Sequence, residues 1–223
     1  MIAAVIHARV GSQRCKNKML RDFAGTNLIT LALGKYSKPS AAFKLYFAAY
    51  EPELIEIGQK YDCTIIKRDE ESVKSERIEV IMDYMKHIPE KNVMFINACH
   101  SFLTMETLEN AIEQYEKKKA VSMTSVVKAH TWYYFMDGRP INFLDPTNPN
   151  TKTTEPLYQV AHAFHIFDRE RFIKHHYYWA HKKNDPLFFE ISEKEAIDID
   201  TELDFVKAES LYIYENGVQR DLL

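Results

Sequence analysis

Residues 3–20 read AAVIHARVGSQRCKNKML, and the rest of the chain is organised around this stretch. The apolar run from Ile2 to Ile6 has the length of a buried strand and is far too short to cross a membrane. The segment from Arg9 to Lys18 follows it and carries four cationic side chains around a glycine. Ligands of open α/β sheets gather at the carboxyl ends of strands, so a ligand is expected at this segment.

This segment has the composition that a bound triphosphate requires. Gly11 lets backbone N–H groups approach phosphate oxygens, and the guanidinium and ammonium groups around it neutralise a polyanion from several sides. A solvated basic loop is the alternative, because such loops are common on protein surfaces. The Gly-Lys-Ser/Thr of a Walker loop is missing, so a phosphate site here would belong to another class.

Two motifs near opposite ends of the chain resemble one known family. The string A-R-x-G-S-x-R-x-x-x-K-x-L begins at Ala8 and is followed by Gly25 and Leu28-Ile29. It is similar to the N-terminal signature of the cytidylyltransferases that make CMP-activated sugar acids, the CMP-sialic acid synthetase group. Residues 196–204, AIDIDTELD, resemble the D-x-D metal segment of the same family.

The resemblance implies a fold and a nucleotide site. The fold would be one three-layer α/β domain over residues 1–223, with a mostly parallel sheet of the nucleotide-diphospho-sugar transferase type. CTP would bind at positions matched by Arg9, Ser12 and Lys18, and Arg14 matches the related spore-coat polysaccharide type. The implied nucleotide-binding set is Ala8, Arg9, Gly11, Ser12, Arg14, Lys18 and Arg68, and the implied catalytic set is Arg9, Lys18 and Asp200.

Arg68 has two interpretations. It follows a predicted strand, at the place where the family has an arginine beside the nucleotide. Its neighbours Lys67 and Asp69 do not reproduce the family's Arg-Pro, so a surface Arg68 in a salt bridge is the alternative.

Asp198 and Asp200 are the predicted metal ligands. They alternate with two isoleucines, which on an extended segment places both carboxylates on one face. Such a pair suits Mg²⁺, which commonly takes one or two carboxylates and completes its shell with water and phosphate oxygens. The alternative is a helix start, because the segment from Thr201 to Asp204 is also a capping box; both interpretations can hold together.

The segments expected to bind the acceptor depart from the family pattern. The family's Gln-Pro-Thr-Ser-Pro-Leu-Arg is replaced by NACHSFL (97–103), and its Asn-Gly-Ala-Ile-Tyr by AHAFH (161–165). An arginine is lost and two imidazoles are gained, so the predicted acceptor-binding residues are Asn97, His100 and His162. Packed, hydrogen-bonded histidines are the alternative. His162 and His165 are three apart on a predicted strand, which predicts opposite orientations and argues against a shared metal.

Bulk composition excludes several classes of protein. A net charge of −3 over 223 residues gives no global basic field for nucleic acid. No apolar run approaches the roughly 20 residues of a spanning helix, and no signal peptide precedes Ile2, so no membrane partner is expected. Cys15, Cys63 and Cys99 are odd in number and widely spaced, which argues against a disulfide framework and favours the cytoplasm.

Strand and helix patterns alternate along most of the chain, which is typical of βαβ units. Further strands are predicted at 44–49, 63–66, 92–97, 121–127 and 160–167, and helices at 28–33, from Pro52 through Tyr61, over the apolar stripe of 78–85, after Thr104, and from Asp168 to about His181. The last of these helices carries an aromatic and histidine-rich segment, 175–181, expected to form an exposed surface or an interface.

This alternation stops at residues 128–167, which are predicted to form a β-rich excursion from the sheet. A hairpin is expected from Trp132–Phe135, the turn Asp137-Gly138 and Ile141–Leu144, followed by a polar loop over 145–155. The excursion holds eight aromatic residues, more than a hairpin readily hides. The family resemblance implies a homodimer through this region, whereas a hairpin lying flat on the sheet would bury the rings within one chain.

The sequence therefore predicts a nucleotidyltransferase that moves CMP from CTP to the hydroxyl group of an acidic sugar and releases pyrophosphate, with Mg²⁺ as cofactor. Two alternatives stay open: transfer to another anionic acceptor, such as a phosphosugar or phosphonate, and a relative that binds nucleotide without turnover.

Overall fold

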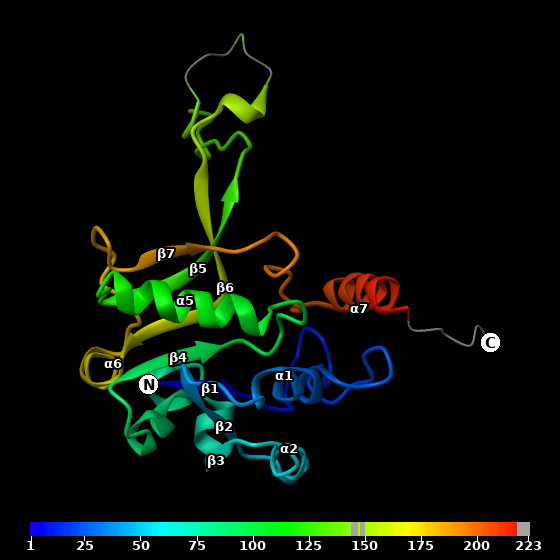
Figure 1. Ribbon diagram of the computed structural model, residues 1–223. Helices are drawn as coiled ribbons and strands as arrows, with labels where there is room; N and C mark the ends of the chain where they lie inside the picture. The colour runs from blue at the N-terminus through cyan, green and yellow to red at the C-terminus, as the bar shows by residue number, and fades with distance from the viewer. Residues whose placement is uncertain (144–146, 148–149, 218–223) are drawn as a thin grey trace, which may run out of the picture.

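The computed structural model describes residues 1–143, 147 and 150–217. Within them, one sheet contains β1 (Ile2–His7), β2 (Phe43–Ala49), β3 (Thr64–Lys67), β4 (Asn92–Ile96), β5 (Ser122–Ala129), β6 (Leu157–Asp168) and β7 (Leu187–Glu190). The strand order is β3-β2-β1-β4-β6-β5-β7. Only β6 runs antiparallel to its neighbours, so the predicted mostly parallel α/β sheet is confirmed (Figure 1).

Helices cover both faces of this sheet, because successive residues of a strand point to opposite faces. On one face, Ile2, Ala4 and Ile6 pack in a core with α1 (Leu28–Tyr36), α2 (Pro52–Gly58), α5 (Met105–Lys117) and α7 (Glu202–Asn216). On the other face, Ala3 and Val5 pack with α4 (Ile78–Ile81), the 3-10 helix η1 (Asp83–His87) and α6 (Arg169–His175). The short helix α3 (Glu70–Lys74) contacts α4. In the described part of the chain, no helix has the length and apolarity needed to span a bilayer.

Some elements differ from the sequence prediction for local reasons. The stripe over 78–85 buries Met82 and Met85 as predicted, but the backbone at Met82 (φ −110°, ψ 23°) divides it into α4 and η1. The second predicted helix ends at Gly58, before Tyr61. The helix predicted to reach His181 ends at His175, because the next residue adopts a left-handed conformation that terminates helices. The sequence pattern does not predict β7.

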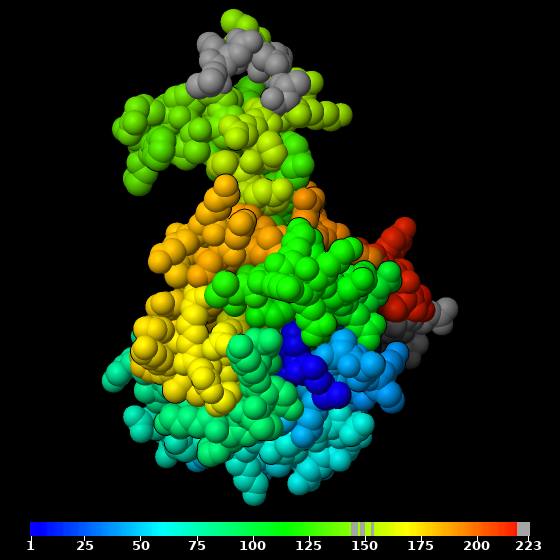
Figure 2. Space-filling model, turned by 60° about the vertical axis from the view of Figure 1, so that its left-hand side comes forward, coloured from blue at the N-terminus to red at the C-terminus, as the bar shows by residue number. Residues whose placement is uncertain are grey.

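The described residues of 130–156, which are 130–143, 147 and 150–156 and are called the arm below, stand away from the sheet in Figure 1 and Figure 2. The predicted hairpin forms only in part: Tyr134 and Pro140 make an isolated bridge, and Gly138 in the turn has a φ of 86°. A 3-10 helix, η2 (Thr151–Thr153), lies further along the arm. The predicted hairpin end at Leu144 and part of the predicted polar loop, residues 145–146 and 148–149, lie outside the described residues.

Part of the predicted aromatic set is on the surface. Tyr134, Phe135 and Tyr158 are 55%, 49% and 46% exposed. Phe164 and Phe167 lie instead in the cores on the two faces of the sheet. The alternative of a hairpin lying flat on the sheet is wrong, because the arm projects beyond the sheet (Figure 1).

Candidate active site

The two sequence motifs meet in space. The buried Nζ of Lys18 donates hydrogen bonds to the carbonyl oxygen of Ile199 at 2.6 Å and to Oδ1 of Asp200 at 3.2 Å. The guanidinium of Arg14 donates to the other carboxylate oxygen of Asp200 at 3.0 Å. Segments about 180 residues apart in the sequence therefore share one cluster of charges, in which two cations flank one carboxylate.

The rest of the basic loop is open to a ligand. Arg9 and Gly11 are exposed, and a Cβ built on Gly11 would meet no atom within 4 Å. Ser12 is partly buried, and its backbone N–H donates to Val10 at 2.7 Å within the loop. Arg9 also donates to the carbonyl oxygen of Val73 at 2.7 Å, which ties the loop to α3. The loop thus keeps cationic groups and free space at the carboxyl end of β1.

Arg68 is buried, and the interpretation as a surface salt bridge is wrong. Its guanidinium donates to the carbonyl oxygens of Ala8 at 3.3 Å, Ser72 at 2.8 Å and Ile81 at 3.1 Å. Burial lowers its pKa, and the nearby Arg9 adds to this, against the raising effect of Tyr84 and nearby carboxylates. Arg68 therefore holds the backbone beneath the loop and meets the nucleotide-binding set through Ala8.

Asp198 differs from Asp200 in its surroundings. Its Oδ1 is buried and has no hydrogen-bond partner among the described residues. Burial, and then the charge of Asp200, raises the pKa of Asp198 to about 6. The predicted capping box is also present, because Thr201 and Asp204 exchange side-chain and backbone hydrogen bonds at the start of α7. The helix cap and the carboxylate pair thus coexist, as the sequence allowed.

His100 lies between the D-x-D segment and β6. It is buried, and its Nε2 donates to the carbonyl oxygen of Ala161 at 3.0 Å. Its Nδ1 lies 4.0 Å from Oδ1 of Asp198. Burial lowers the pKa of His100 to about 4, so the ring is neutral at pH 7. The side chain of Asn97 shapes the same loop by accepting from the N–H of Cys99 at 3.0 Å. His100 is therefore packed, as the alternative had it, and adjoins the predicted metal ligands.

The prediction that His162 and His165 face opposite ways is wrong. His162 Nδ1 lies 3.3 Å from His165 Nε2. The regular alternation fails because β6 bulges: residues 160 and 165 of β6 stand opposite 126 and 124 of β5, and His162 has a φ of +56°. Ser125 of β5 fills the gap, since its hydroxyl accepts from the backbone N–H groups of residues 163 and 164 at 3.0 and 3.2 Å.

Aromatic rings on one sheet face connect the two parts of the site. His7, which ends β1, packs on Phe95 at 4.7 Å between ring centroids, and Phe95 stacks on His165 at 6.2 Å. Tyr178 and Trp179 lie 4.8 and 5.1 Å from His165. The prediction of an exposed surface at 175–181 is therefore wrong for Tyr178 and Trp179, which enclose the imidazole of His165.

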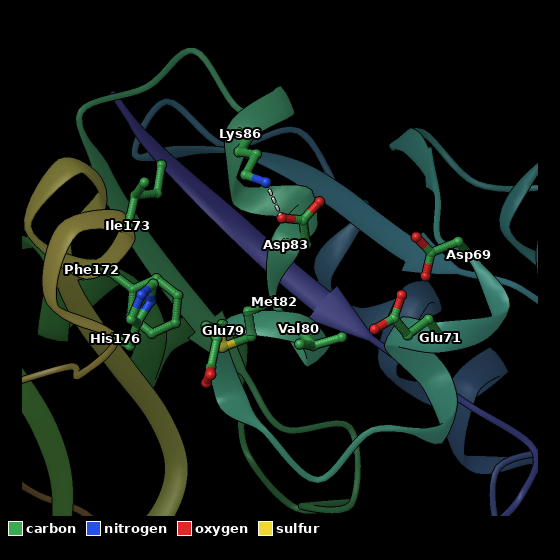
Figure 3. A pocket seen from close by; sticks show the side chains of 10 residues that line it. All are labelled: Asp69, Glu71, Glu79, Val80, Met82, Asp83, Lys86, Phe172, Ile173 and His176. Carbon is green, nitrogen blue, oxygen red and sulfur yellow. Dashed lines mark ion pairs between the residues drawn. The ribbon is translucent and has the colours of Figure 1, made fainter.

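The described residues also form a cavity of about 420 Å³ between α3, α4, η1 and α6 (Figure 3). Four carboxylates line it, those of Asp69, Glu71, Glu79 and Asp83, and the last is paired with Lys86. None of the predicted site residues lines this cavity. Its acidic walls would repel a triphosphate, so the basic loop remains the candidate nucleotide site.

Known structures share this arrangement of helices and strands. CMP:2-keto-3-deoxy-manno-octonic acid synthetase, solved in complex with CTP, superposes with a TM-score of 0.68 at 14% identity, covering 96% of this chain and 100% of its own. 4-Diphosphocytidyl-2C-methyl-D-erythritol synthase from Anaerococcus prevotii gives a TM-score of 0.65 at 15% identity, covering 95% of each chain. At these identities the likeness shows the fold alone.

The sequence places the chain more closely. Residues 3–218 match the family model described as Cytidylyltransferase, and the chain belongs to this family of CTP-dependent nucleotidyltransferases. CMP-N,N'-diacetyllegionaminic acid synthase of Legionella pneumophila is 24% identical over 228 residues, which cover 94% of this chain and 95% of its own. The resemblance inferred from the two motifs is thereby confirmed.

The roles of several residues at the site could not be predicted from the sequence. Thr124, Ser125 and His7 lie in ordinary strand patterns, and their polar atoms acquire a role only through the bulge and the neighbouring rings. The sequence shows a histidine at position 165, but the alternation of a regular strand predicts that its side chain points away from His162. The bulge carries neither glycine nor proline, so no turn signal marks it.

Proposed function

We propose that the protein transfers CMP from CTP to a hydroxyl group of an acidic sugar, a sialic-acid-like or other 2-keto sugar acid, in the biosynthesis of a surface polysaccharide or glycoconjugate. The observation that carries this proposal is the contact of Lys18 and Arg14 with Asp200, which joins the basic loop to the D-x-D segment. The acceptor class is supported by the relatives, since both the Legionella protein and the octonic acid synthetase are named for acidic sugars.

In this reaction the acceptor oxygen attacks the α-phosphorus in line, a new O–P bond forms, and the bond to pyrophosphate breaks as the hydroxyl proton is released. Such a transfer leaves little covalent chemistry to the protein, which acts by positioning and by neutralising charge. Arg9, Arg14 and Lys18 are the groups that neutralise the triphosphate in the proposal. Of the predicted acceptor-binding residues, His162 is exposed and would contact the acceptor, whereas Asn97 and His100 support the adjoining loop from within; this region is called the acceptor end below.

We also propose Mg²⁺ as the cofactor, held by Asp198 and Asp200. The donor set fits, because Mg²⁺ takes one or two carboxylates and leaves its other positions to water and substrate phosphates. The buried, unpartnered Oδ1 of Asp198 supports a missing ligand at this point. When bound, the ion would withdraw charge from the phosphate oxygens. Activity that persists in excess chelator would remove Mg²⁺ from the proposal.

Pyrophosphate release across a panel of substrates tests the reaction. Purified protein is supplied with CTP, UTP, ATP or GTP and with sialic acid, N,N'-diacetyllegionaminic acid or 2-keto-3-deoxy-manno-octonic acid. Turnover with CTP and one of these acids is expected. Turnover only with a sugar phosphate or a phosphonate would support the alternative acceptor class. Binding of CTP without turnover on any acceptor would support the non-catalytic alternative.

The arm supports a further part of the proposal, a two-fold homodimer. Tyr134 and Phe135 expose aromatic surface away from the sheet, and aromatic residues favour the centres of specific interfaces. Light scattering at micromolar concentration should give twice the chain mass of 26.2 kDa. The double variant Tyr134→Ser, Phe135→Ser should shift the protein toward monomer. A wild-type monomer with full specific activity would contradict the dimer.

Two broader expectations belong to the same proposal. The first is a single nucleotidyltransferase domain over residues 1–223, supported by a family match that spans 3–218. The second is a cytoplasmic location, supported by the three free thiols of Cys15, Cys63 and Cys99, which suit a reducing compartment. Limited proteolysis yielding one protected core, and cell fractionation, are the respective tests.

A further inference from the structure

A continuous hydrogen-bond chain leads from the sheet interior to the surface beside the acceptor end. The hydroxyl of Thr124 lies 2.8 Å from Nδ1 of His165, and Nε2 of His165 lies 3.3 Å from Nδ1 of His162. Thr124 and His165 are buried, whereas His162 is exposed. The chain therefore couples two buried groups to one imidazole that a ligand can reach.

His165 is neutral and fixed in place. Burial, and then the nearby His162 and His100, lowers the pKa of His165 to about 3. A neutral imidazole has one donor and one acceptor nitrogen. Stacked rings on either side, Tyr178 at 4.8 Å and Phe95 at 6.2 Å, restrict its rotation. The chain consequently has a direction, in which every donor faces an acceptor.

Thr124 decides that direction. In the part of the chain that the structure describes, the nitrogen of His165 is the only hydrogen-bond partner of its hydroxyl. If His165 donated to Thr124, the hydroxyl proton would be buried without an acceptor, which costs about 1–3 kcal/mol. If Thr124 donates instead, His165 carries its proton on Nε2 and gives that hydrogen bond to Nδ1 of His162. His162 then carries its own proton on Nε2.

The bulge presents this Nε2–H at the surface. The left-handed backbone of His162 turns its ring toward His165 and leaves the side chain exposed. The preceding residue, Ala161, accepts from His100, whose other nitrogen adjoins Asp198. His162 therefore directly follows the residue that His100 contacts, and His100 borders the predicted metal ligands. An acceptor sugar held beside these ligands would project its substituents toward this part of β6.

We propose that His162 binds the carboxylate of the acceptor through Nε2–H, and that Thr124 and His165 are positioning residues that fix its orientation and tautomer. This inference rests on the proposed function for the identity of the acceptor. It assigns carboxylate recognition to the Nε2–H of one imidazole at the point where the family pattern changes to AHAFH. Thr124 and His165 act through His162 and touch no substrate.

Imidazole ¹⁵N chemical shifts of histidine-labelled protein test the chain without any turnover. In the wild type, His162 should be protonated on Nε2. Thr124→Val removes the hydroxyl with little change of volume and should abolish this preference, and Thr124→Ser should restore it. A wild-type His162 protonated on Nδ1, or the same tautomer in all three proteins, would overturn the proposal. Assignment of the signal uses His162→Gly, because glycine accepts the left-handed backbone without strain.

Ligand titration separates this inference from the proposed function. Sialic acid, N,N'-diacetyllegionaminic acid and 2-keto-3-deoxy-manno-octonic acid are added in turn while the His162 Nε2 signal is followed. A shift with at least one acid supports carboxylate binding even if that acid is not turned over, in which case only the proposed reaction fails. No shift with any acid that the enzyme turns over, or with all three if none is turned over, overturns the inference.

Kinetics supply the last readout where an acid is turned over. His162→Gly should raise KM for the acid about tenfold, the loss of one hydrogen bond to a charged group, and leave KM for CTP within twofold. Thr124→Val should raise KM for the acid about threefold, and Thr124→Ser should return it to the wild-type value. Equal increases for acid and CTP in Thr124→Val would indicate a merely structural role.

Discussion

The proposed nucleotide half of the site, around Lys18, Arg14 and Asp200, and the proposed acceptor half, around His100, His162 and His165, are held together by different interactions. In the nucleotide half, Lys18 and Arg14 hold Asp200 through charge, and the side chain of Arg14 is 71% exposed. In the acceptor half, His100 and His165 are buried and neutral, held by carbonyl, hydroxyl and ring contacts. The attraction between opposite charges depends mainly on which residue types are present and little on their orientation. A neutral hydrogen bond, in contrast, forms only where a donor faces an acceptor.

The largest expected effect comes from removing the charge of Asp200. Asp200→Asn should lower turnover by about 100-fold or more while leaving the fold intact, because it removes one charge and changes little volume. Asp204→Asn is the matched control: it weakens the cap of α7, should cost about 1 kcal/mol of folding free energy, and should leave turnover unchanged. Full activity in Asp200→Asn would end the assignment of the nucleotide half.

Lys18 is expected to discriminate between nucleotides by their charge. Lys18→Met should weaken CTP binding about tenfold or more and CMP binding much less, because CMP has no β- and γ-phosphates to meet the ammonium group. Lys16→Met in the same loop is the control, since Lys16 is exposed, and should change CTP affinity by about twofold. Calorimetry with both nucleotides measures the difference. Equal losses for CTP and CMP would mean that Lys18 only supports Ile199 and Asp200.

Acid should destabilise the ring-lined face of the sheet that carries His7 and His165. Burial, with nearby cations for His7, lowers the pKa of each imidazole to about 3. The unfolded chain, with histidine pKa near 6.5, binds these protons first, so stability is full above pH 6.5 and falls as pH decreases toward 3. Each histidine contributes a loss of about 1.4 kcal/mol per pH unit in that window.

Urea denaturation at pH 7.5, 6 and 5 measures this loss. Asp198 opposes it in part, because its raised pKa makes its contribution to stability increase as pH falls through about 6. The double variant His7→Phe, Tyr84→Phe removes one buried imidazole and its hydrogen-bond partner together, and should reduce the pH slope by about one proton. An unchanged slope would show that His7 does not titrate as proposed.

The smallest effect is expected at Arg14. Arg14→Ala should raise KM for CTP only about two- to threefold, because the exposed guanidinium is screened and Lys18 still holds Asp200. The rise should shrink further as salt increases. Arg139→Ala, which removes an equally exposed cation from the arm, should leave KM for CTP unchanged. A tenfold or larger rise in KM for CTP with Arg14→Ala would contradict this account, in which an exposed, screened guanidinium adds little to what Lys18 already provides.

The sequence predicted the surroundings of Lys18 and Asp200 better than those of His162 and His165, for a physical reason. Apolar runs such as Ile2–Ile6 define the sheet, and the carboxyl ends of its strands define where Arg9 to Lys18 must lie. The same reasoning failed between His162 and His165, because it assumed that side chains alternate regularly between the two faces of the sheet, and the bulge interrupts this alternation. It also failed after His175, where a left-handed residue ends α6 and returns Tyr178 to the core. Backbone irregularities of this kind carry no signal in residue type alone.

The bulge opposite Ser125 also bears on how this enzyme can diversify. Residues 161–162 are out of register with β5 and lie beyond the last pair with β4, Ile96–Phe164, so we expect a one-codon insertion or deletion there to leave both ladders in place. Such a change would put another side chain in the place of His162 without disturbing Lys18 or Asp200. If His162 binds the acceptor as proposed, descendants could exchange one acceptor for another in a single mutational step while inheriting the nucleotide chemistry unchanged.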